Sequence, residues 1–469
     1  MPDRALASVG GPLGRYARRP SWRSAVWPFV ALAAVPMQLA MIERAFCIEH
    51  GWIGQDMFSR ACFSDLPVQF TTGKLSGGFA AYVEGLAHVD QPVVTGAVMS
   101  VLGGIAGPGA VTSSQRSYFF IWAVVATLLV MATAWFSAAS RPRTAGIVAA
   151  VALSPLLVTA VMVGPDIVGV TLVAAGMWAW ARRRPALAGA LLGVAVMART
   201  YPLLVIAALV LLALRAGRLD RLRSLLGAAG VAAAGIALVF GVAHHQTLTA
   251  AYRTWWSSPP GFGSPWFVPQ LATSAGPTTT APPVIRAVAR IVDAILAHPV
   301  PVGAATALAV LGMVLALVAG FVLALGARRR PTWAEVSLVM VGIALVTGKS
   351  VPVQASLWLL PLAALAGIRW RDQFIWIGTE VVHFIAVWLY AGGLARPDRG
   401  LPAGWYSLFL VLRLAGIGWL VVCAWRQANA RPAHDPDPGW PEDPARDDVV
   451  DELSGLLTGE PDRVIAVYG

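Results

Sequence analysis

Apolar residues occur along this chain in long runs that short polar turns separate. The runs are rich in Leu, Ala, Val and Gly and hold few charges. A helix needs about 20 apolar residues to cross a bilayer, whereas a transmembrane barrel shows shorter alternating segments. The pattern therefore predicts an all-α polytopic membrane protein. We expect about 12 spans, at residues 25–42, 117–137, 146–163, 166–181, 186–198, 202–214, 224–243, 303–325, 333–348, 353–368, 374–391 and 405–424.

Some apolar runs are too short to cross a bilayer alone. Residues 186–198 and 202–214 meet at Arg199-Thr200-Tyr201-Pro202, and at about 1.5 Å per residue neither spans about 30 Å. Such short helices occur where the membrane is thinned or a cavity is lined. The run Val93 to Ala106 would reverse the orientation of every later turn if it crossed. We therefore expect it to lie on or dip into the outer leaflet.

The basic residues predict the orientation of the chain. Residues 1–24 hold five arginines, which places a basic N-terminus in the cytoplasm. With twelve spans, the later clusters all fall on that same side, and so does the C-terminus. These clusters are Arg141 with Arg143, Arg182 to Arg184, Arg215 to Arg223, Arg328 to Arg330, and Arg369 with Arg371.

The net charge of +11 is divided unevenly along the chain. Residues 431–469 hold three Arg against ten Asp and Glu, a net charge of −7, so the remainder carries +18. Because this positive charge lies in short turns between spans, it indicates membrane orientation and not nucleic-acid binding. We divide the chain into the N-terminus, a membrane domain at 25–425 and an acidic tail at 426–469. The tail is expected to be cytoplasmic and largely disordered, with one short helix from Val449 to Leu457 and no identified partner.

Two large polar segments face outward in this topology, residues 43–116 and 246–302. The second ends in an amphipathic pattern from Ile285 to Leu296. The first gathers carboxylates, and a transfer to a hydroxyl needs one base within hydrogen-bond reach of it. Asp65, set between Phe63 and a Leu-Pro turn, is the first candidate base. Asp56 and Asp90 follow it, and each of the three is alternatively a solvated loop acid.

Two cations stand against the orientation rule at outer ends of spans. Arg199 and Lys349 each adjoin a proline-containing turn, where a lipid phosphate would suit them. The alternative is that they reach to the head groups without a function. Within the spans, Glu380 is expected to form a structural pair with His383 or Arg413.

Other residues of the outer side are candidates for binding a substrate. Trp255 and Trp256 stack on sugar rings or belong to an interfacial aromatic belt. Asp166 contacts a substrate or caps a helix, and Arg60 lies in the first loop. Cys47 and Cys62 share that loop and either form a disulfide or remain free thiols, while Cys423 lies in the last span. The chain shows no nucleotide-binding glycine loop and no HExxH or GxSxG motif, and we expect no obligatory metal or other cofactor.

Several short stretches resemble bacterial polyprenyl-phosphate-sugar-dependent enzymes of glycosyltransferase family 87, in the GT-C class. The stretches are Cys62 to Pro67, Asp90 to Gly96, Gly164 to Ile167, Arg199 to Leu204, Gly348 through Gln354 to Pro361, and Glu380 to Tyr390. The chain departs from the family pattern at Asp90-Gln91-Pro92, at the two residues before Asp166, and at Arg199, where lysine is frequent. The missing aromatic residues put the identity of the acceptor in doubt.

The resemblance implies a GT-C-like helical bundle and an inverting transfer at the outer face of a bacterial plasma membrane. Arg199, Lys349 and Tyr201 would hold the phosphate of a polyprenyl-phosphate sugar, and Gln354 would contact substrate. Mannose is the first choice of sugar and arabinose the second, with a glycolipid or polysaccharide as acceptor. Two alternatives remain open at this point: a lipid or solute transporter, and a non-catalytic scaffold for envelope assembly.

Overall fold

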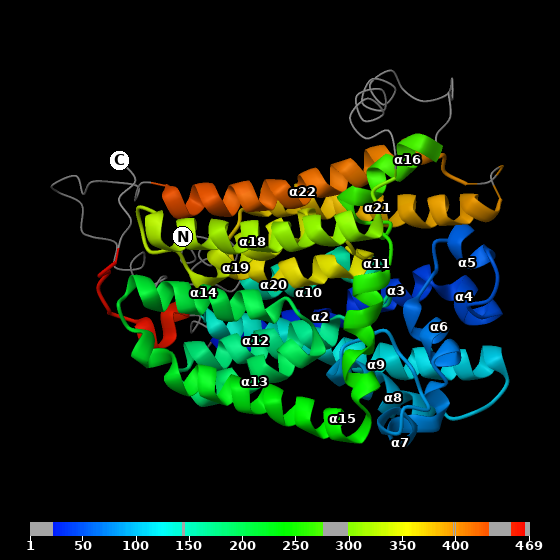
Figure 1. Ribbon diagram of the computed structural model, residues 1–469, viewed down its shortest axis with the longest axis horizontal. Coiled ribbons are helices and arrows are strands. Elements are labelled where there is room, and N and C mark those ends of the chain that lie inside the picture. The colour runs from blue at the N-terminus through cyan, green and yellow to red at the C-terminus, as the bar shows by residue number, and fades with distance from the viewer. Residues whose placement is uncertain are drawn as a thin grey trace, which may run out of the picture.

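The computed structural model describes residues 22–142, 146–274, 299–396, 398, 400–430 and 452–464, and within these ranges it is helical with no strand. The helices lie mostly side by side along the long axis of the molecule (Figure 1). Six helical segments in this part of the chain are long and apolar enough to cross a membrane. They are α2 with α3 (Trp22–Leu32, Ala34–Glu43), α9 (Val111–Ser140), η2 with α15 (Leu219–Leu222, Arg223–Ser257), α18 (Val302–Gly326), α21 (Trp370–Ala395) and α22 (Ala403–Asn429).

Shorter apolar helices occupy the remaining expected spans. They are α10 (Gly146–Ala152) with α11 (Leu156–Ala160), α12 (Ile167–Ala181), α13 (Pro185–Ala198), α14 (Pro202–Arg215), α19 (Trp333–Val346), and η4 (Val353–Ala355) with α20 (Ser356–Ala366). Each span expected from the sequence thus coincides with a helix. The predicted all-α polytopic membrane architecture is confirmed.

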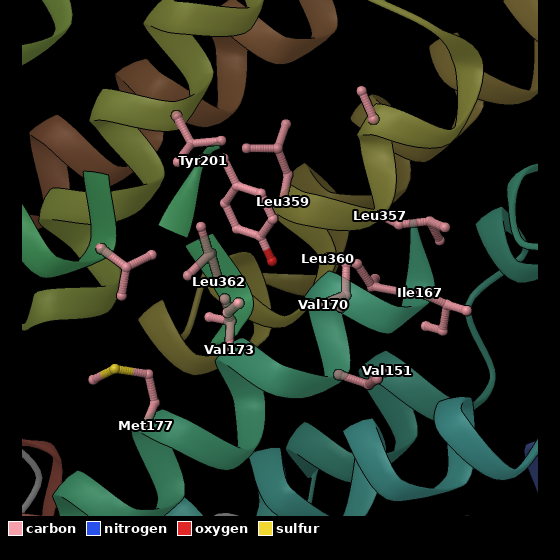
Figure 2. Packing of buried hydrophobic residues seen from close by; sticks show 14 of the residues in the cluster. Val151, Ile167, Val170, Val173, Met177, Tyr201, Leu357, Leu359, Leu360 and Leu362 are labelled. Carbon is pink, nitrogen blue, oxygen red and sulfur yellow. The ribbon is translucent and has the colours of Figure 1, made fainter. Parts of the chain in front are cut away.

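The short helices form the interior of the bundle. Almost every side chain of α12, α19 and α20 is buried. Figure 2 shows Ile167, Val170 and Val173 of α12 packed with Leu359 and Leu360 of α20. Because these helices are covered by protein on most sides, they need not match the thickness of the bilayer.

Small residues let neighbouring helices approach closely. On α13, a Cβ at Gly189 would lie 2.0 Å from the carbonyl oxygen of Leu225 on α15. One at Gly193 would lie 2.4 Å from that of Ala229. This Gly-x-x-x-Gly spacing is typical of membrane helices whose backbones touch. Apolar side chains gain little by moving from lipid to another helix, so helix association in a membrane relies on close packing, which small residues allow.

The first polar segment folds into short helices at one end of the bundle. They are α4 (Ala45–His50), α5 (Asp56–Ser59), α6 (Asp65–Thr72), η1 (Leu75–Gly77) and α7 (Gly78–Val83). We call this the loop end, and we call the opposite end, where residues 452–464 lie, the tail end (Figure 1). The run Val93–Ala106 forms α8. Asp90 before it contacts Thr254, and Thr112 after it lies against Gly51, so α8 starts and finishes at the loop end.

The second polar segment, residues 246–302, begins within a helix. Helix α15 continues to Ser257 after a non-helical residue, His244, where it changes direction (Figure 1). Gly85 packs so closely on the ring of His244 that a Cβ there would lie 2.4 Å from it. Beyond Ser257 come η3 (Pro265–Phe267) and α16 (Val268–Ser274), while the amphipathic stretch 285–296 lies outside the described residues.

The acidic tail contains a short helix within the stretch, Val449 to Leu457, that was predicted to hold one. Residues 452–464 are helical up to η5 (Gly455–Leu457) and dock on the tail end, because their acidic side chains pair with arginines of the turns there. Residues 431–451 lie outside the described residues.

Candidate active site

Asp65 stands at the first position of α6, and the chain around it is fixed to a neighbouring turn. The hydroxyl of Ser64 caps α6 by accepting from the amide of Leu66, and it donates to the carbonyl of Met162 at 2.6 Å. The amide of Asp65 donates to the carbonyl of Val163 at 2.8 Å. These bonds hold Asp65 against the turn between α11 and α12.

A disulfide anchors the same loop on its other side. Cys47 of α4 is joined to Cys62, three residues before Asp65. The indole N–H of Trp52 donates to the carbonyl of Cys62 at 3.0 Å. Closing a loop of this length stabilises a fold by roughly 3 kcal/mol, so Asp65 is carried by a restrained segment.

An arginine–aspartate pair lies beneath this loop. Arg199, in the turn between α13 and α14, donates from Nε and Nη2 to the carboxylate of Asp166, at 2.9 and 2.8 Å. Both side chains are buried, and Nη1 of Arg199 also donates to Gln91. Gly169 makes room for the pair, because a Cβ there would lie 2.9 Å from Cγ of Arg199.

Two aromatic residues complete the surroundings of the pair. Trp358 of α20 donates from its indole N–H to Asp166 at 2.8 Å. Tyr201 stacks on Trp358, with ring centroids 4.8 Å apart. The hydroxyl of Tyr201 is buried, finds no hydrogen-bond partner in the described part of the chain, and belongs to the apolar cluster of α12 and α20 (Figure 2).

The electrostatic surroundings of Asp65 differ from those of an ordinary surface acid. Burial and the nearby carboxylate of Asp166 raise the pKa of Asp65 to about 6, while a hydrogen bond from Gln354 and the charge of Arg199 lower it. The residue as a whole is half-buried. A carboxylate with a raised pKa is suited to accept a proton near neutral pH.

The structure thus brings together five of the residues singled out from the sequence. They come from four separate segments: Asp65, Asp166, Arg199 with Tyr201, and Gln354. Gln91 and Trp358 belong to the same cluster, but sequence reasoning did not select them as site residues. Each lies more than 100 positions from the residue that it contacts. The one signal for them in the sequence was their place inside two of the stretches that resemble the family.

Lys349 lies in a different environment from Arg199. It is fully buried, and its ammonium donates to the carbonyls of Trp255 and Trp256 and to the hydroxyl of Thr306, at 2.9, 2.9 and 2.8 Å. Its three N–H groups are all used, so in this arrangement Lys349 holds the end of α15. Trp256 is exposed, and the ring of Trp255 lies 5.3 Å from the ammonium.

The other candidate residues of the first loop have partners outside the cluster. Asp56 forms an exposed ion pair with Arg396 at 3.0 Å, and Asp90 accepts from Thr254 at 2.9 Å. The guanidinium of Arg60 lies over the ring of Phe46. Among the described residues, none of these three side chains forms a hydrogen bond or ion pair with Asp65, Asp166 or Arg199.

A second buried ion pair lies inside the bundle. Arg413 donates from Nε to Glu380 at 2.9 Å, and both side chains are almost fully buried. Arg413 also donates to the carbonyls of Val351 and Pro352, at 2.8 and 2.9 Å. The partner of Glu380 is therefore Arg413 and not His383. The pair fixes the turn that leads to Gln354.

Metal binding has no visible basis in the described ranges, which contain no group of three or more His, Cys, Asp or Glu side chains placed to hold an ion. Independence from metals stays a prediction.

Comparison with known proteins gives one match. A model of glycosyltransferase family 87 matches residues 92–351, a range that includes Asp166, Arg199, Tyr201 and Lys349. No curated protein and no solved structure matches the chain. Likeness to the GT-C bundle therefore stays a prediction.

Proposed function

Since the chain belongs to glycosyltransferase family 87, we propose that this glycosyltransferase takes its sugar from a polyprenyl-phosphate donor and uses Asp65 as general base. The acceptor is a glycolipid or polysaccharide of the cell envelope. Mannose is the favoured sugar and arabinose the second choice. In the predicted orientation the loop end faces the outside of a bacterial plasma membrane, where donor and acceptor lipids meet.

The observation that carries the proposal is the position of Asp65. Asp65 is a half-buried residue at the loop end, and burial together with Asp166 raises the pKa of its carboxyl group to about 6. Above that pH it is ionised and still basic enough to take a proton from a sugar hydroxyl as that hydroxyl attacks. The ion pairs and hydrogen bonds around it restrain it before the substrate binds.

The reaction is an inverting displacement. The acceptor oxygen forms a bond to the anomeric carbon while its proton moves to Asp65. The bond from that carbon to the phosphate oxygen breaks, and its electron pair leaves with the polyprenyl phosphate. Positive groups near the departing phosphate stabilise the negative charge that develops there.

Arg199 is the cation that suits the donor phosphate. Three of its five N–H groups are engaged by Asp166 and Gln91, which leaves two N–H groups of a positioned guanidinium. Lys349 is not part of the phosphate site that we propose, because its donors are occupied at the end of α15. Trp358 holds Asp166 through its indole N–H, and Tyr201 stacks on Trp358.

The proposal is tested by replacing Asp65 with the isosteric amide. In membranes supplied with a polyprenyl-phosphate mannose, and in parallel with its arabinose counterpart, Asp65→Asn should lower transfer by about 10²–10⁴-fold. The matched control is Asp56→Asn, which removes an exposed acid of the same loop and should leave transfer within about twofold of wild type.

Protein level and thermal unfolding of both variants are measured together with activity. Full activity of Asp65→Asn at wild-type stability would refute Asp65 as the base. Failure of the wild-type protein with both donors would refute the donor class.

A further inference from the structure

The end of the acidic tail occupies a basic surface at the tail end of the bundle. Residues 452–464 lie against the turn between α14 and α15 and the turn between α18 and α19 (Figure 1). These two turns are far apart in sequence, and their arginines belong to the clusters that set the predicted orientation. The tail segment touches both of them.

Two acidic residues make the charged contacts. Asp462 pairs with Arg215, the last residue of α14 before the first turn, at 2.8 Å and with Arg330 of the second turn at 2.7 Å. Glu460 pairs with Arg218 at 2.7 Å and Arg221 at 3.3 Å. A single carboxylate, Asp462, therefore bridges the two turns.

Hydrogen bonds to main-chain carbonyls add to these pairs. The amides of Arg463 and Val464 both donate to the carbonyl of Arg215 at 2.9 Å. Arg330 donates to the carbonyl of Glu460 at 2.6 Å. Arg215 itself is buried and also donates to the carbonyls of Ala324 and Ala327, at the end of α18.

Apolar contacts fix the other half of the segment. Leu453 and Leu457 are buried in the main core cluster. Between them Gly455, with φ +58°, lies so close to Trp180 of α12 that a Cβ would come within 2.6 Å of its carbonyl oxygen. The surface is thus complementary to an acidic segment that carries two leucines around a glycine.

We propose that residues 452–464 are a latch, an intramolecular ligand that pins the turn between α14 and α15 to the turn between α18 and α19. Residues 431–451 tether the latch to α22, which keeps its effective concentration high. The partner of the acidic tail is in this view the basic surface of its own chain. The proposal is independent of the sugar and of the donor.

The latch has a consequence for the membrane domain. Between α14 and α18 lies an apolar groove of about 560 Å³, lined on α18 by Leu317, Val318 and Phe321 and on α14 from Leu203 to Leu211. Its loop-end boundary, Leu203, is two residues from Tyr201 of the candidate site. The latch joins the other ends of these same two helices and so restrains the spacing on which the groove depends.

The contacts are of a kind that salt weakens. Glu460, Asp462 and Arg218 are partly exposed, and such pairs contribute little individually and are screened at high ionic strength. The latch is therefore expected to release in high salt or when its two carboxylates are neutralised.

Hydrogen exchange of the full-length protein, followed by mass spectrometry in detergent, tests the latch. In Glu460→Gln/Asp462→Asn, amides of residues 452–464 should exchange at least about tenfold faster than in wild type. Amides of residues 213–222 and 323–330 should accelerate with them. The matched control is Asp447→Asn/Asp448→Asn, which makes the same charge change in the tether and should alter none of these segments.

A charge reversal with a compensating second substitution distinguishes loss of the ion pair from misfolding. Arg218→Glu should release the segment, and adding Glu460→Arg should restore part of its protection. Wild-type residues 452–464 that exchange at the rate of an unstructured peptide would overturn the docking. A released segment with unchanged exchange in both turns would overturn the pinning. An unchanged rate in the doubly neutralised variant would show that the carboxylates do not hold the segment, which also contradicts the latch.

Discussion

At the scale of single residues, the surroundings distinguish Asp65 from the other acids of the first loop. Asp56 is an exposed member of an ion pair, and Asp90 is an exposed acceptor from Thr254. Asp65 is set instead between Asp166, Arg199 and Gln354, which act on its charge in opposite directions. The sequence shows that position 65 holds an aspartate. The electrostatic field around its carboxyl group depends on three other segments, which meet it only in the folded chain.

The pH dependence of transfer should report this field. Asp65 must be ionised to act as a base, so activity should rise with pH through about 6 and level off above it. Gln354 donates a hydrogen bond that lowers the pKa of Asp65. Gln354→Met removes this bond and should move the rising limb of kcat/KM to higher pH, while activity at the alkaline plateau is retained.

The control for this shift is Asp56→Asn, which should leave the limb in place. A limb that stays near pH 6 in Gln354→Met, or that moves to lower pH, would contradict the assignment of Asp65 as the titrating base.

At the scale of elements, the candidate site lies where short helices stop. Helices α12, α13, α14 and α20 begin or end at Asp166, Arg199, Tyr201 and Gln354 to Ser356. At about 1.5 Å per residue, helices of this length are shorter than the hydrocarbon core. Their polar ends therefore gather below the loop, and α6 places Asp65 over them.

A substitution of Lys349 tests how another element, the C-terminal end of α15, is held. It is one of only two lysines in the chain and contacts the last carbonyls of that helix. Lys349→Met leaves these groups without their donor, so it should lower the stability of the protein by about 1–3 kcal/mol. Thermal unfolding in detergent measures this loss, and the KM for the donor should stay close to that of wild type.

The other lysine supplies the matched control. Lys74 is exposed in the first loop, and Lys74→Met should change the unfolding temperature little. A raised donor KM in Lys349→Met at unchanged stability would instead return Lys349 to the phosphate site.

At the scale of the whole molecule, two groups of polar contacts between segments lie at opposite ends of the bundle. Asp65, Asp166, Arg199 and Gln354 meet at the loop end. At the tail end, Arg141 reaches the carbonyl of Leu365 and Arg329 that of Gln427. These contacts agree with the alternating spans expected from the sequence. They do not depend on which end faces the cell exterior.

Labelling of whole cells decides the orientation. Lys74 at the loop end and Arg184 at the tail end are both exposed. Each is replaced by cysteine, Lys74→Cys or Arg184→Cys, in a protein that carries Cys423→Ser. A membrane-impermeant maleimide should label the first in intact cells and the second only after lysis, because the basic turns remain in the cytoplasm. The opposite labelling pattern would invert the proposed topology.

The sequence by itself determined the helices, because apolar runs and basic turns are local signals that a bilayer selects strongly. It also supplied the acids and cations of the candidate site, and it left the pairing of Cys47 with Cys62 open. Only the tertiary structure decided which charges are neutralised. Arg199 is paired with Asp166, Lys349 with the end of α15, and Asp462 with Arg215 and Arg330. Such pairings join residues distant in sequence, and their free energy depends on burial and distance, which no local pattern encodes.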